Sequence, residues 1–453
     1  MVAIPVLIVI PATDTVRESA RVSAQSFAAG SRAATGIDKA AESDLPNGVV
    51  LDTNFAAVPL GMAKPTAKSF KMTATSKDKQ YVVRGTVDSD HISSLTSTRS
   101  DGPRVFCDAQ VGLMPICPGD PARGNAADVR GLLGVSQLSR RHLSGDGVAV
   151  AIVDTGINLA HLRQRGLSAR LDPHIFWSPT PNINPGEYPV DHGTMCAYAV
   201  SIAAPECTLL DFPLLGSTTS GGSVMDGFLS DAVQAYSVML TMMRKPEAER
   251  PYHSLVVNNS WGMFHHSWDF PAGHPGRYAD NPNHPFNLIV GSLAQSGADI
   301  LFAAGNCGTD CPDGRCQGVT TDVITGANSH PDVLSIAGVD VNQDRVGYSS
   351  MGPGQAPLAT QKPDLAAYTH FNGSNAFGVG SPDGGTSTAC PVAAGCIAAV
   401  RTSLPPSLMS PADLAQAARD SAVKPSGPSG WDNETGFGII SPTNLATQVN
   451  PMV

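Results

Sequence analysis

Short, uninterrupted runs of apolar and β-branched residues constrain the fold of this chain more than any other feature. Such runs cover residues 148–153, 255–257, 300–304 and 333–339. A strand with one face in water alternates apolar and polar residues, whereas a strand that is apolar throughout is buried on both faces. Helical patterns lie between the runs, among them residues 225–243 with a Met-rich apolar face. We therefore predict a three-layer α/β domain with a mostly parallel sheet.

The first part of the chain has a different pattern. Strand patterns cover residues 6–10, 70–73, 80–87 and 104–110, and helical patterns cover residues 13–29 and 89–96. Two β-α-β halves of this size predict a small α+β sandwich. A chain of 453 residues is too long for one ordinary domain. We assign residues 1–117 to the small domain, the Pro- and Gly-containing residues 118–129 to a linker, and residues 130–453 to the α/β domain.

The charge and hydropathy of the chain argue against two classes of partner. Lys and Arg number 29 against 39 Asp and Glu, which gives a formal net charge of −10. A nucleic acid would be repelled, and no basic cluster offsets that repulsion. No apolar run reaches the roughly 18 residues that span a bilayer. We expect neither a nucleic-acid partner nor a membrane partner.

The N-terminus and the cysteines bear on the location of the protein. Residues 1–11 are apolar, but they lack a positively charged start and a small-x-small cleavage site, so they predict a buried strand rather than a signal peptide. The nine cysteines are an odd number and widely spread, which fits free thiols in a reducing compartment better than a full disulfide framework. We expect a cytoplasmic protein, with export by a route not visible in the sequence as the alternative.

Three segments carry residues that could act together in catalysis. Asp154 follows a buried strand, His192 precedes a helical run at residues 195–204, and Ser387 precedes a helix of small residues at 392–400. Open α/β sheets place their sites at the carboxyl ends of strands. Taken singly, these residues are more often a helix cap, a core histidine and an N-cap. An aspartic peptidase would need a second Asp-Thr/Ser-Gly, which the sequence lacks.

In local sequence and in the chain order Asp, His, Ser, these segments resemble the signatures of subtilisin-like serine peptidases, the subtilases. The resemblance extends over about residues 130–447 and includes further matching segments at residues 134–138, 348–353, 362–367, 431–433 and 436–438. It implies a serine endopeptidase with Asp154, His192 and Ser387 as its triad. Ser387 would attack the peptide carbonyl, His192 would transfer the proton, and Asp154 would orient the imidazole.

The same resemblance implies the binding groups around the triad. The side-chain amide of Asn306 and the backbone N–H of Ser387 would form the oxyanion hole. An extended peptide or protein substrate would pair as a strand between two walls of the primary pocket. These walls are Asn259, Ser260, Trp261 and Gly262 on one side and Ala303, Ala304 and Gly305 on the other. Trp261 is larger than the aliphatic residue often found there and is expected to narrow the neighbouring subsite. No cofactor is expected.

Two departures from the family concern metals. The helix after His192 runs without interruption to Pro205, so the calcium-binding loop of many subtilisins is missing and we predict no tight calcium site there. Three cysteines follow Asn306, and they could bind zinc, form one disulfide with a spare thiol, or be buried. A structural zinc site needs four ligands, so we favour a disulfide or free thiols. These cysteines are Cys307, Cys311 and Cys316.

Four histidines lie in a Pro-rich insertion that follows the predicted substrate-pairing strand at residues 258–262, and a fifth lies just before that strand. They could ligate a metal, but a solvated loop is the more common environment for such residues. We therefore predict no metal site. The histidines are His253, His265, His266, His274 and His284.

The small N-terminal domain resembles a subtilase propeptide in size, position and pattern. We expect it to inhibit its own catalytic domain, with residues 111–114 in the cleft and self-cleavage between Leu113 and Asp128. A permanent regulatory or docking domain is the alternative.

Two other functions of the whole chain fit less well. An inactive scaffold would not need every catalytic residue, and an α/β-hydrolase esterase would need a Gly-x-Ser-x-Gly elbow and the order Ser, Asp, His.

Overall fold

The computed structural model describes residues 3–14, 16–21, 45–60, 80–95, 102–113, 120–179, 182–216, 226–424 and 429–449. Its central element is a seven-stranded sheet with the order β15-β14-β13-β11-β7-β9-β8, and every neighbouring pair is parallel. The strands are β7 (Val148–Val153), β8 (Arg170–Leu171), β9 (Thr208–Phe212), β11 (Ser254–Asn259), β13 (Ala298–Ala303), β14 (Leu334–Val339) and β15 (Leu365–Tyr368). The predicted parallel α/β sheet is confirmed.

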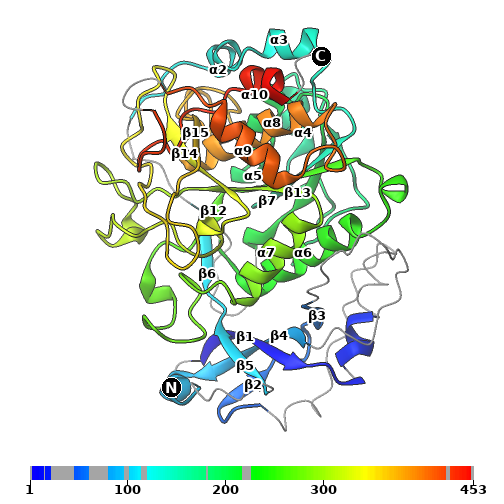
Figure 1. Cartoon of the computed structure of the whole chain (residues 1–453), viewed down its shortest axis with the longest axis vertical. Coiled ribbons are helices and arrows are strands. Elements are labelled where there is room, and N and C mark those ends of the chain that lie inside the picture. The colour runs from blue at the N-terminus through cyan, green and yellow to red at the C-terminus, as the bar shows by residue number, and fades with distance from the viewer. Residues whose placement is uncertain are drawn as a thin grey trace.

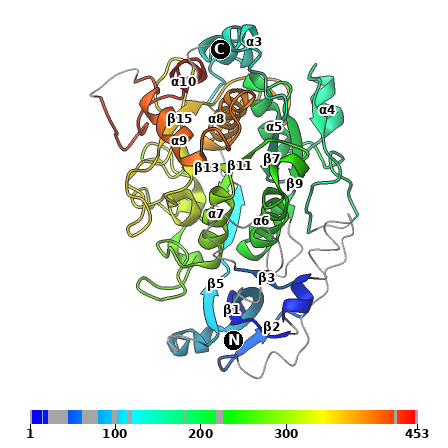
Figure 2. The same ribbon diagram turned by 45° about the vertical axis from the view of Figure 1, so that its right-hand side comes forward.

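Burial on both faces explains the apolar runs. Along β7, Ala149, Ala151 and Val153 pack into one hydrophobic core, and the residues between them pack into the other. Figures 1 and 2 show α6 (Leu229–Met243) and α7 (Pro285–Gln295) on one side of the sheet. The other side carries α2 (Ala126–Leu132), α3 (Val135–Arg140), α4 (Leu159–Gln164), α5 (His192–Ala203), α8 (Thr386–Arg401), α9 (Pro411–Asp420) and α10 (Pro442–Val449).

Helices α5 and α8 approach each other closely, and this contact brings two site residues together. A Cβ atom on Gly395 of α8 would lie 2.3 Å from the carbonyl oxygen of Val200 in α5, so a larger residue would push the helices apart. His192 is the first residue of α5 and Ser387 is the second of α8. The small residues of α8 therefore let these two helix N-termini meet over the carboxyl edge of the sheet.

The N-terminal residues form an antiparallel sheet below α6 and α7 (Figure 1). Its strands are β1 (Ala3–Pro11), β2 (Val49–Leu51), β3 (Val58–Pro59), β4 (Gln80–Asp88) and β5 (Arg104–Cys107). The expected strand at residues 6–10 is present and buried, and a 3-10 helix, η2 (Ser89–Ser94), occupies the expected short helix. Of the expected helix at residues 13–29, positions 14 and 16–21 are helical. Residues 15, 22–44 and 70–73 lie outside the described residues.

A third, three-stranded antiparallel sheet joins the two parts of the chain, in the order β10-β6-β12. Its members are β6 (Gln110–Leu113), β10 (Asp226–Phe228) and β12 (Trp261–Gly262). In Figure 1, β6 runs from the N-terminal sheet up to β12. The remaining short helices are η3 (Leu214–Gly216), η4 (Glu247–Glu249), η5 (His266–Trp268), η6 (Gly314–Cys316) and η7 (Gly326–Ser329).

The structure corrects several of the expected boundaries. The strand expected at residues 104–110 ends at Cys107, because the carboxylate of Asp108 turns away to cap α6 at the N–H of Ser230. Helix α6 begins at Leu229, since residues 226–228 pair with β6 as a strand; Met225 lies outside the described residues. The last residues of the expected linker, 126–129, are helical, with Asn125 as the N-cap of α2.

Among the described helices, none has both the length and the apolar composition that a bilayer crossing requires.

Candidate active site

Asp154 and His192 meet at the carboxyl edge of the sheet. Asp154 directly follows β7, and His192 Nδ1 lies 2.8 Å from Asp154 Oδ1 and 3.0 Å from Oδ2. Both side chains are buried. The imidazole therefore donates through Nδ1, which makes Nε2 the basic nitrogen. Nε2 is buried and has no partner in the described part of the chain, so it is the atom that can take a proton.

The turn after Asp154 is interlocked with the start of α5. Thr155 Oγ1 accepts a hydrogen bond from the N–H of Gly193, at 2.9 Å. A Cβ atom on Gly193 would lie 2.5 Å from the carbonyl oxygen of Gly156, and Gly156 itself has φ +101°. Only glycine adopts that φ readily. The Asp-Thr-Gly and His-Gly-Thr sequences are thus two halves of one contact that fixes Asp154 against His192.

Ser387 is held by its own carbonyl group. Its carbonyl oxygen would normally accept from the N–H of residue 391, but that residue is Pro391, which has no N–H. The oxygen accepts instead from Ser260 Oγ at 2.9 Å and from Cys196 Sγ at 3.5 Å. Cys196 Sγ also lies 3.6 Å from Asp154 Oδ2 and 3.8 Å from His192 Nδ1. One thiol therefore contacts all three predicted triad residues.

The Ser387 hydroxyl donates to the carbonyl oxygen of Ser260 at 3.3 Å rather than to His192. The structure thus gathers the three residues and forms the Asp154–His192 hydrogen bond, while the hydroxyl takes a different acceptor. Catalytic hydrogen bonds are often long or badly aligned without substrate and tighten when substrate binds.

Asn306 is oriented by the residue before Ser387. Its Oδ1 accepts from Thr386 N at 2.9 Å and from Thr386 Oγ1 at 3.0 Å. A backbone N–H can only donate, so the amide oxygen must face Thr386 and the Nδ2 group must point elsewhere. Thr386 is a residue that sequence reasoning missed, because nothing local in the sequence relates it to position 306.

The predicted substrate segments lie beside one another, but not all their side chains face a cleft. Asn259 is fully buried, where its Oδ1 accepts from Tyr236 and its Nδ2 donates to the carbonyl of Leu301. The indole of Trp261 is also fully buried, with ring centroids 5.7 Å from Phe286 and 5.3 Å from Phe302. Any contact of these two residues with substrate would therefore come from their backbone.

A residue not predicted from the sequence joins the two predicted walls. Asn328 Nδ2 donates to the carbonyl oxygens of Trp261 at 3.1 Å and Ala303 at 2.8 Å. Ala303 and Ala304 are buried at the end of β13, and Gly305 has φ +117°. The side-chain amide of Asn328 thus fixes the spacing between the two segments.

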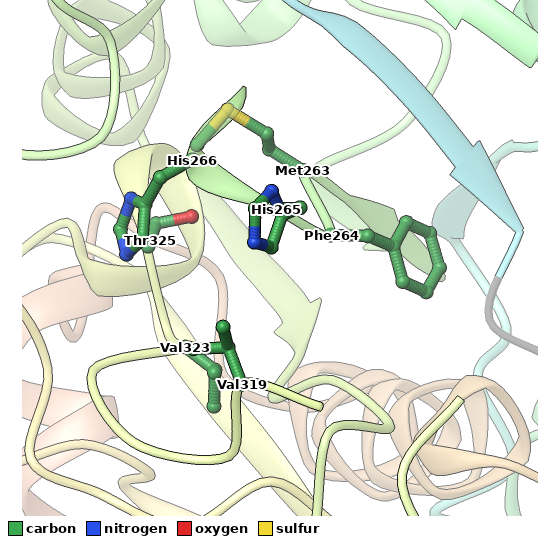
Figure 3. Close-up of a pocket in the computed structure, with 7 residues that line it drawn as sticks. All are labelled: Met263, Phe264, His265, His266, Val319, Val323 and Thr325. Atoms are coloured by element: carbon green, nitrogen blue, oxygen red, sulfur yellow. The ribbon is translucent and has the colours of Figure 1, made fainter. Parts of the chain in front are cut away.

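A small pocket adjoins the end of β12, and it contains two of the insertion histidines. Figure 3 shows residues 263–266 on one side and Val319, Val323 and Thr325 around the other. His265 Nδ1 contacts Ser267, and His266 Nδ1 accepts from Arg277 at 3.0 Å. Burial lowers the pKa of His266 below its ordinary value. Both imidazoles therefore have protein partners.

His284 corrects the expectation of a solvated loop. It is fully buried, its Nε2 donates to the carbonyl oxygen of Cys107 at 2.6 Å, and its Nδ1 accepts from the N–H of Phe286. Desolvation lowers its pKa to about 3, so the ring is neutral. The carbonyl of Cys107 belongs to the N-terminal sheet, so this histidine belongs to the contact between the two parts of the chain.

The cysteines after Asn306 form disulfides. Cys307 is bonded to Cys316, and Cys311 is also disulfide-bonded, so the loop keeps no spare thiol. Free thiols remain at Cys107, Cys196, Cys207, Cys390 and Cys396, all buried. The uninterrupted α5 agrees with the sequence, and the absence of calcium there stays a prediction.

One described group could hold a metal ion. Donor atoms of Asp154, His192 and Cys196 lie within 4.8 Å of one another. Burial raises the pKa of the Cys196 thiol well above its ordinary value, so it is protonated, and a protonated thiol is a poor metal ligand. The same carboxylate and imidazole already form the hydrogen bond of an acid–base pair. The group fits proton transfer better than metal binding.

The site combines a carboxylate–imidazole pair with a serine at a helix N-terminus, at the edge of a parallel α/β sheet. These features place the chain among the α/β proteins whose sites resemble those of serine hydrolases. Within this class, the sequence model of the subtilase family matches residues 145–438. The match covers more than half of the chain, and the chain belongs to the subtilase family.

Individual relatives are distant. The chain is 25% identical over 321 residues to subtilisin-like protease SBT6.1 of Arabidopsis thaliana, covering 68% of this chain and 27% of the relative. It is 28% identical over 204 residues to proprotein convertase subtilisin/kexin type 4 of Rattus norvegicus, covering 43% of this chain and 27% of the relative. The chain thus spans about a quarter of the length of these relatives. A solved structure, MycP1 from the ESX-1 type VII secretion system, aligns with a TM-score of 0.46 and 18% identity, over 76% of this chain and 90% of MycP1.

Proposed function

We propose that the chain is a serine endopeptidase that cleaves peptide bonds through an acyl-enzyme on Ser387. The observation that carries this proposal is the buried Asp154–His192 hydrogen bond, which lies in the same cluster of contacts as Ser387. His192 Nε2 takes the hydroxyl proton as Ser387 attacks the substrate carbonyl, and then protonates the leaving amine. Asp154 keeps the imidazole in the correct tautomer and stabilises its charged form.

The developing oxyanion needs donors that are fixed before the reaction begins. The backbone N–H of Ser387 at the start of α8 is one donor, and Asn306 Nδ2 is the other. Because Thr386 holds the amide oxygen, the Nδ2 group keeps its direction without substrate. This preorganisation supports hydrolysis rather than simple peptide binding.

The three-stranded sheet suggests how a substrate binds. In β6, Gly112 pairs with Asp226 on one side and with Gly262 on the other, and Leu113 pairs with Trp261. A peptide in this position forms main-chain hydrogen bonds on both edges, so affinity depends little on its side chains. We infer that substrates bind as the central strand between β10 and β12.

In the intact chain, β6 itself takes this place, which supports an intramolecular inhibitor. The N-terminal unit (residues 1–117) also contacts the catalytic domain elsewhere. Cys107 N donates to the carbonyl of Gly276 at 2.8 Å, and Arg84 pairs with Asp231 of α6 at 3.1 Å. We propose that this unit docks on α6 and the insertion, and that its tail blocks the cleft until the chain cuts itself between Leu113 and Asp128.

Two measurements test these proposals. A fluorophosphonate should label the processed enzyme, and mass mapping should place the label on Ser387; labelling elsewhere, or none in folded protein, would refute the serine mechanism. The Ser387→Ala variant should stay full length while the parent acquires a new N-terminus between residues 114 and 128. Equal trimming of both would show that another peptidase removes the N-terminal unit and would refute self-processing.

The disulfides favour the export alternative for location. Cys307, Cys311 and Cys316 are disulfide-bonded, and disulfides persist in oxidising compartments but are rare in the cytosol. We therefore propose that the chain works outside the cytoplasm. Thiol mapping of protein from its native source should find Cys307 and Cys316 oxidised; finding both as free thiols would favour the cytoplasmic location.

A further inference from the structure

Asp211 is a buried acid that the proposed mechanism does not use. It lies on β9, directly opposite Ile152 of β7, and its side chain is fully buried. No cation pairs with it in the part of the chain that the structure describes; the charged group that faces it is Asp154. A buried carboxylate without a cation is costly, so its retention requires other strong contacts.

Those contacts are backbone N–H groups of the turn that follows Asp154 and of a neighbouring loop. Asp211 Oδ1 accepts from Ile157 N at 3.2 Å, and Oδ2 accepts from Gly186 N at 2.8 Å and from Ile157 N at 3.3 Å. The same two segments bond each other, because Tyr188 N donates to the carbonyl of Ile157. Asp211 is therefore one of two described side chains that tie the turn to the loop, because Asn158 Nδ2 also donates to the carbonyl oxygen of Tyr188 at 2.7 Å.

The turn connects the hydrogen bonds of Asp211 to the proposed triad. It begins at Asp154 and contains Thr155, whose hydroxyl accepts the N–H of Gly193 next to His192. A shift of the turn would therefore move Asp154 and the first residue of α5 relative to each other. We propose that Asp211 is a positioning residue that holds Asp154 and His192 in register for proton transfer. This inference rests on the proposed serine peptidase function.

The ionisation of Asp211 gives the inference a distinctive signature. Burial raises its pKa to about 7, against the lowering effect of the Gly186 and Ile157 N–H groups, and Asp154 raises it further. An ionised carboxylate can accept both N–H groups, whereas the protonated form carries an O–H that cannot face a donor. Below about pH 7 a proton on Oδ1 leaves Ile157 N only its 3.3 Å contact with Oδ2, which also accepts from Gly186 N, so the bond between Asp211 and the turn weakens. Protonation of Asp211 should then add one proton to the acid limb of kcat/KM.

The test uses the processed enzyme and a peptide substrate, over about pH 5 to 9. Rates are referred to the concentration of enzyme that a fluorophosphonate titrates. Over this range the parent should lose kcat/KM with a slope approaching two on the acid side. Asp211→Asn should show a slope of one and a kcat lower by about 10²-fold or more, with KM changed little, because misplacement affects the chemical step. Asp211→Glu should keep the steeper slope.

Asp269→Asn is a matched control. Asp269 is a buried carboxylate of the insertion that accepts from the N–H groups of Phe270, Tyr278 and Ala279. The same substitution there should leave the slope at two, even if it lowers stability. A purely structural role for Asp211 would likewise lower stability without changing the slope.

A slope of one in the parent enzyme overturns the inference, and this result needs no variant to fold. A slope of two in Asp211→Asn also overturns it. Where Asp211→Asn folds poorly, the low-field proton resonance of His192 Nδ1 in the parent provides a second readout, which should shift with the ionisation of Asp211. Failure of the proposed function is a separate outcome, because the fluorophosphonate would then not label Ser387 at all.

Discussion

At the scale of single residues, the oxyanion site depends on one amide whose direction is set by a neighbour of the nucleophile. Thr386 supplies two donors to Asn306 Oδ1, one from its backbone and one from its hydroxyl. The donor end of the amide is therefore fixed before substrate arrives. Such a donor contributes chiefly to the transition state, in which negative charge develops on the substrate oxygen.

Asn306→Ala should consequently lower kcat and leave KM almost unchanged. We expect a loss of about 10²–10³-fold, which is the range known for the corresponding asparagine of subtilisin itself. Steady-state kinetics with a peptide substrate provide the measurement. Thr386→Val removes the hydroxyl donor but keeps the N–H, so its loss should be under about tenfold. A change confined to KM in Asn306→Ala would assign the amide to ground-state binding instead.

Residue partners of this kind could not be read from the sequence. That Asp154, His192, Ser387 and Asn306 lie together was predictable because each lies in a local motif. Thr386, Asn328 and Asp211 act through atoms of segments far along the chain, and no local pattern marks Thr386 or Asn328. Asp211 did leave one signal, since an acid follows two leucines within a short buried strand.

At the scale of elements, the triad depends on how closely the turn after Asp154 approaches α5. Gly193→Ala should disturb that approach, because its Cβ would lie 2.5 Å from the carbonyl oxygen of Gly156. We expect a loss of about 1–3 kcal/mol in the free energy of unfolding, together with a lower kcat. Urea denaturation and steady-state kinetics measure the two effects.

Gly131→Ala is the matched control for this contact. Gly131 lies in α2 on the surface, and nothing is within 4 Å of an added Cβ. The change should stabilise the protein by up to about 1 kcal/mol, because alanine favours the helix more than glycine does. Equal effects of the two substitutions would mean that the Gly156–Gly193 contact has no special importance.

At the scale of the whole molecule, the parallel sheet and its helices were predictable from the sequence because burial on both faces leaves long apolar runs. The end of a run was harder to predict. The apolar periodicity of helix α6 extends back to residue 225, but residues 226–228 form a strand that pairs with β6. This pairing could not be predicted from the sequence, because β6 lies more than a hundred residues earlier in the chain. Likewise, the strand expected at 104–110 is broken by the contact of Asp108 with Ser230, more than a hundred residues further along.

The contact between Asp108 and Ser230 also makes docking of the N-terminal unit depend on pH. Asp108 Oδ1 accepts from the N–H of Ser230 at 2.6 Å, and Oδ2 has no partner in the described part of the chain. Burial raises its pKa to about 7; Ser230 and Arg84 oppose that shift, and Asp231 adds to it. Once undocked, the carboxyl returns toward its ordinary pKa of about 3.9.

The docked state therefore binds the proton more tightly than the undocked state. Asp108 stabilises docking most below about pH 4, and this contribution is lost as pH rises to about 7. Over this range the equilibrium constant for docking falls by up to about tenfold per pH unit. Above about pH 7 it is constant. A protonated carboxyl keeps the Ser230 bond through Oδ1 and carries its proton on Oδ2, so docking weakens with rising pH and not with acid.

Amide exchange at Ser230 tests this in full-length Ser387→Ala, which retains the N-terminal unit. After correction for the intrinsic pH dependence of exchange, protection of Ser230 should fall between about pH 5 and 7 and then level off. In Asp108→Asn the protection should be independent of pH over that window, because the amide does not titrate. Asp90→Asn changes an exposed acid of the same unit and should behave as the parent does. Protection that rises with pH in the parent would contradict the expected sign and would place the controlling group elsewhere in the interface.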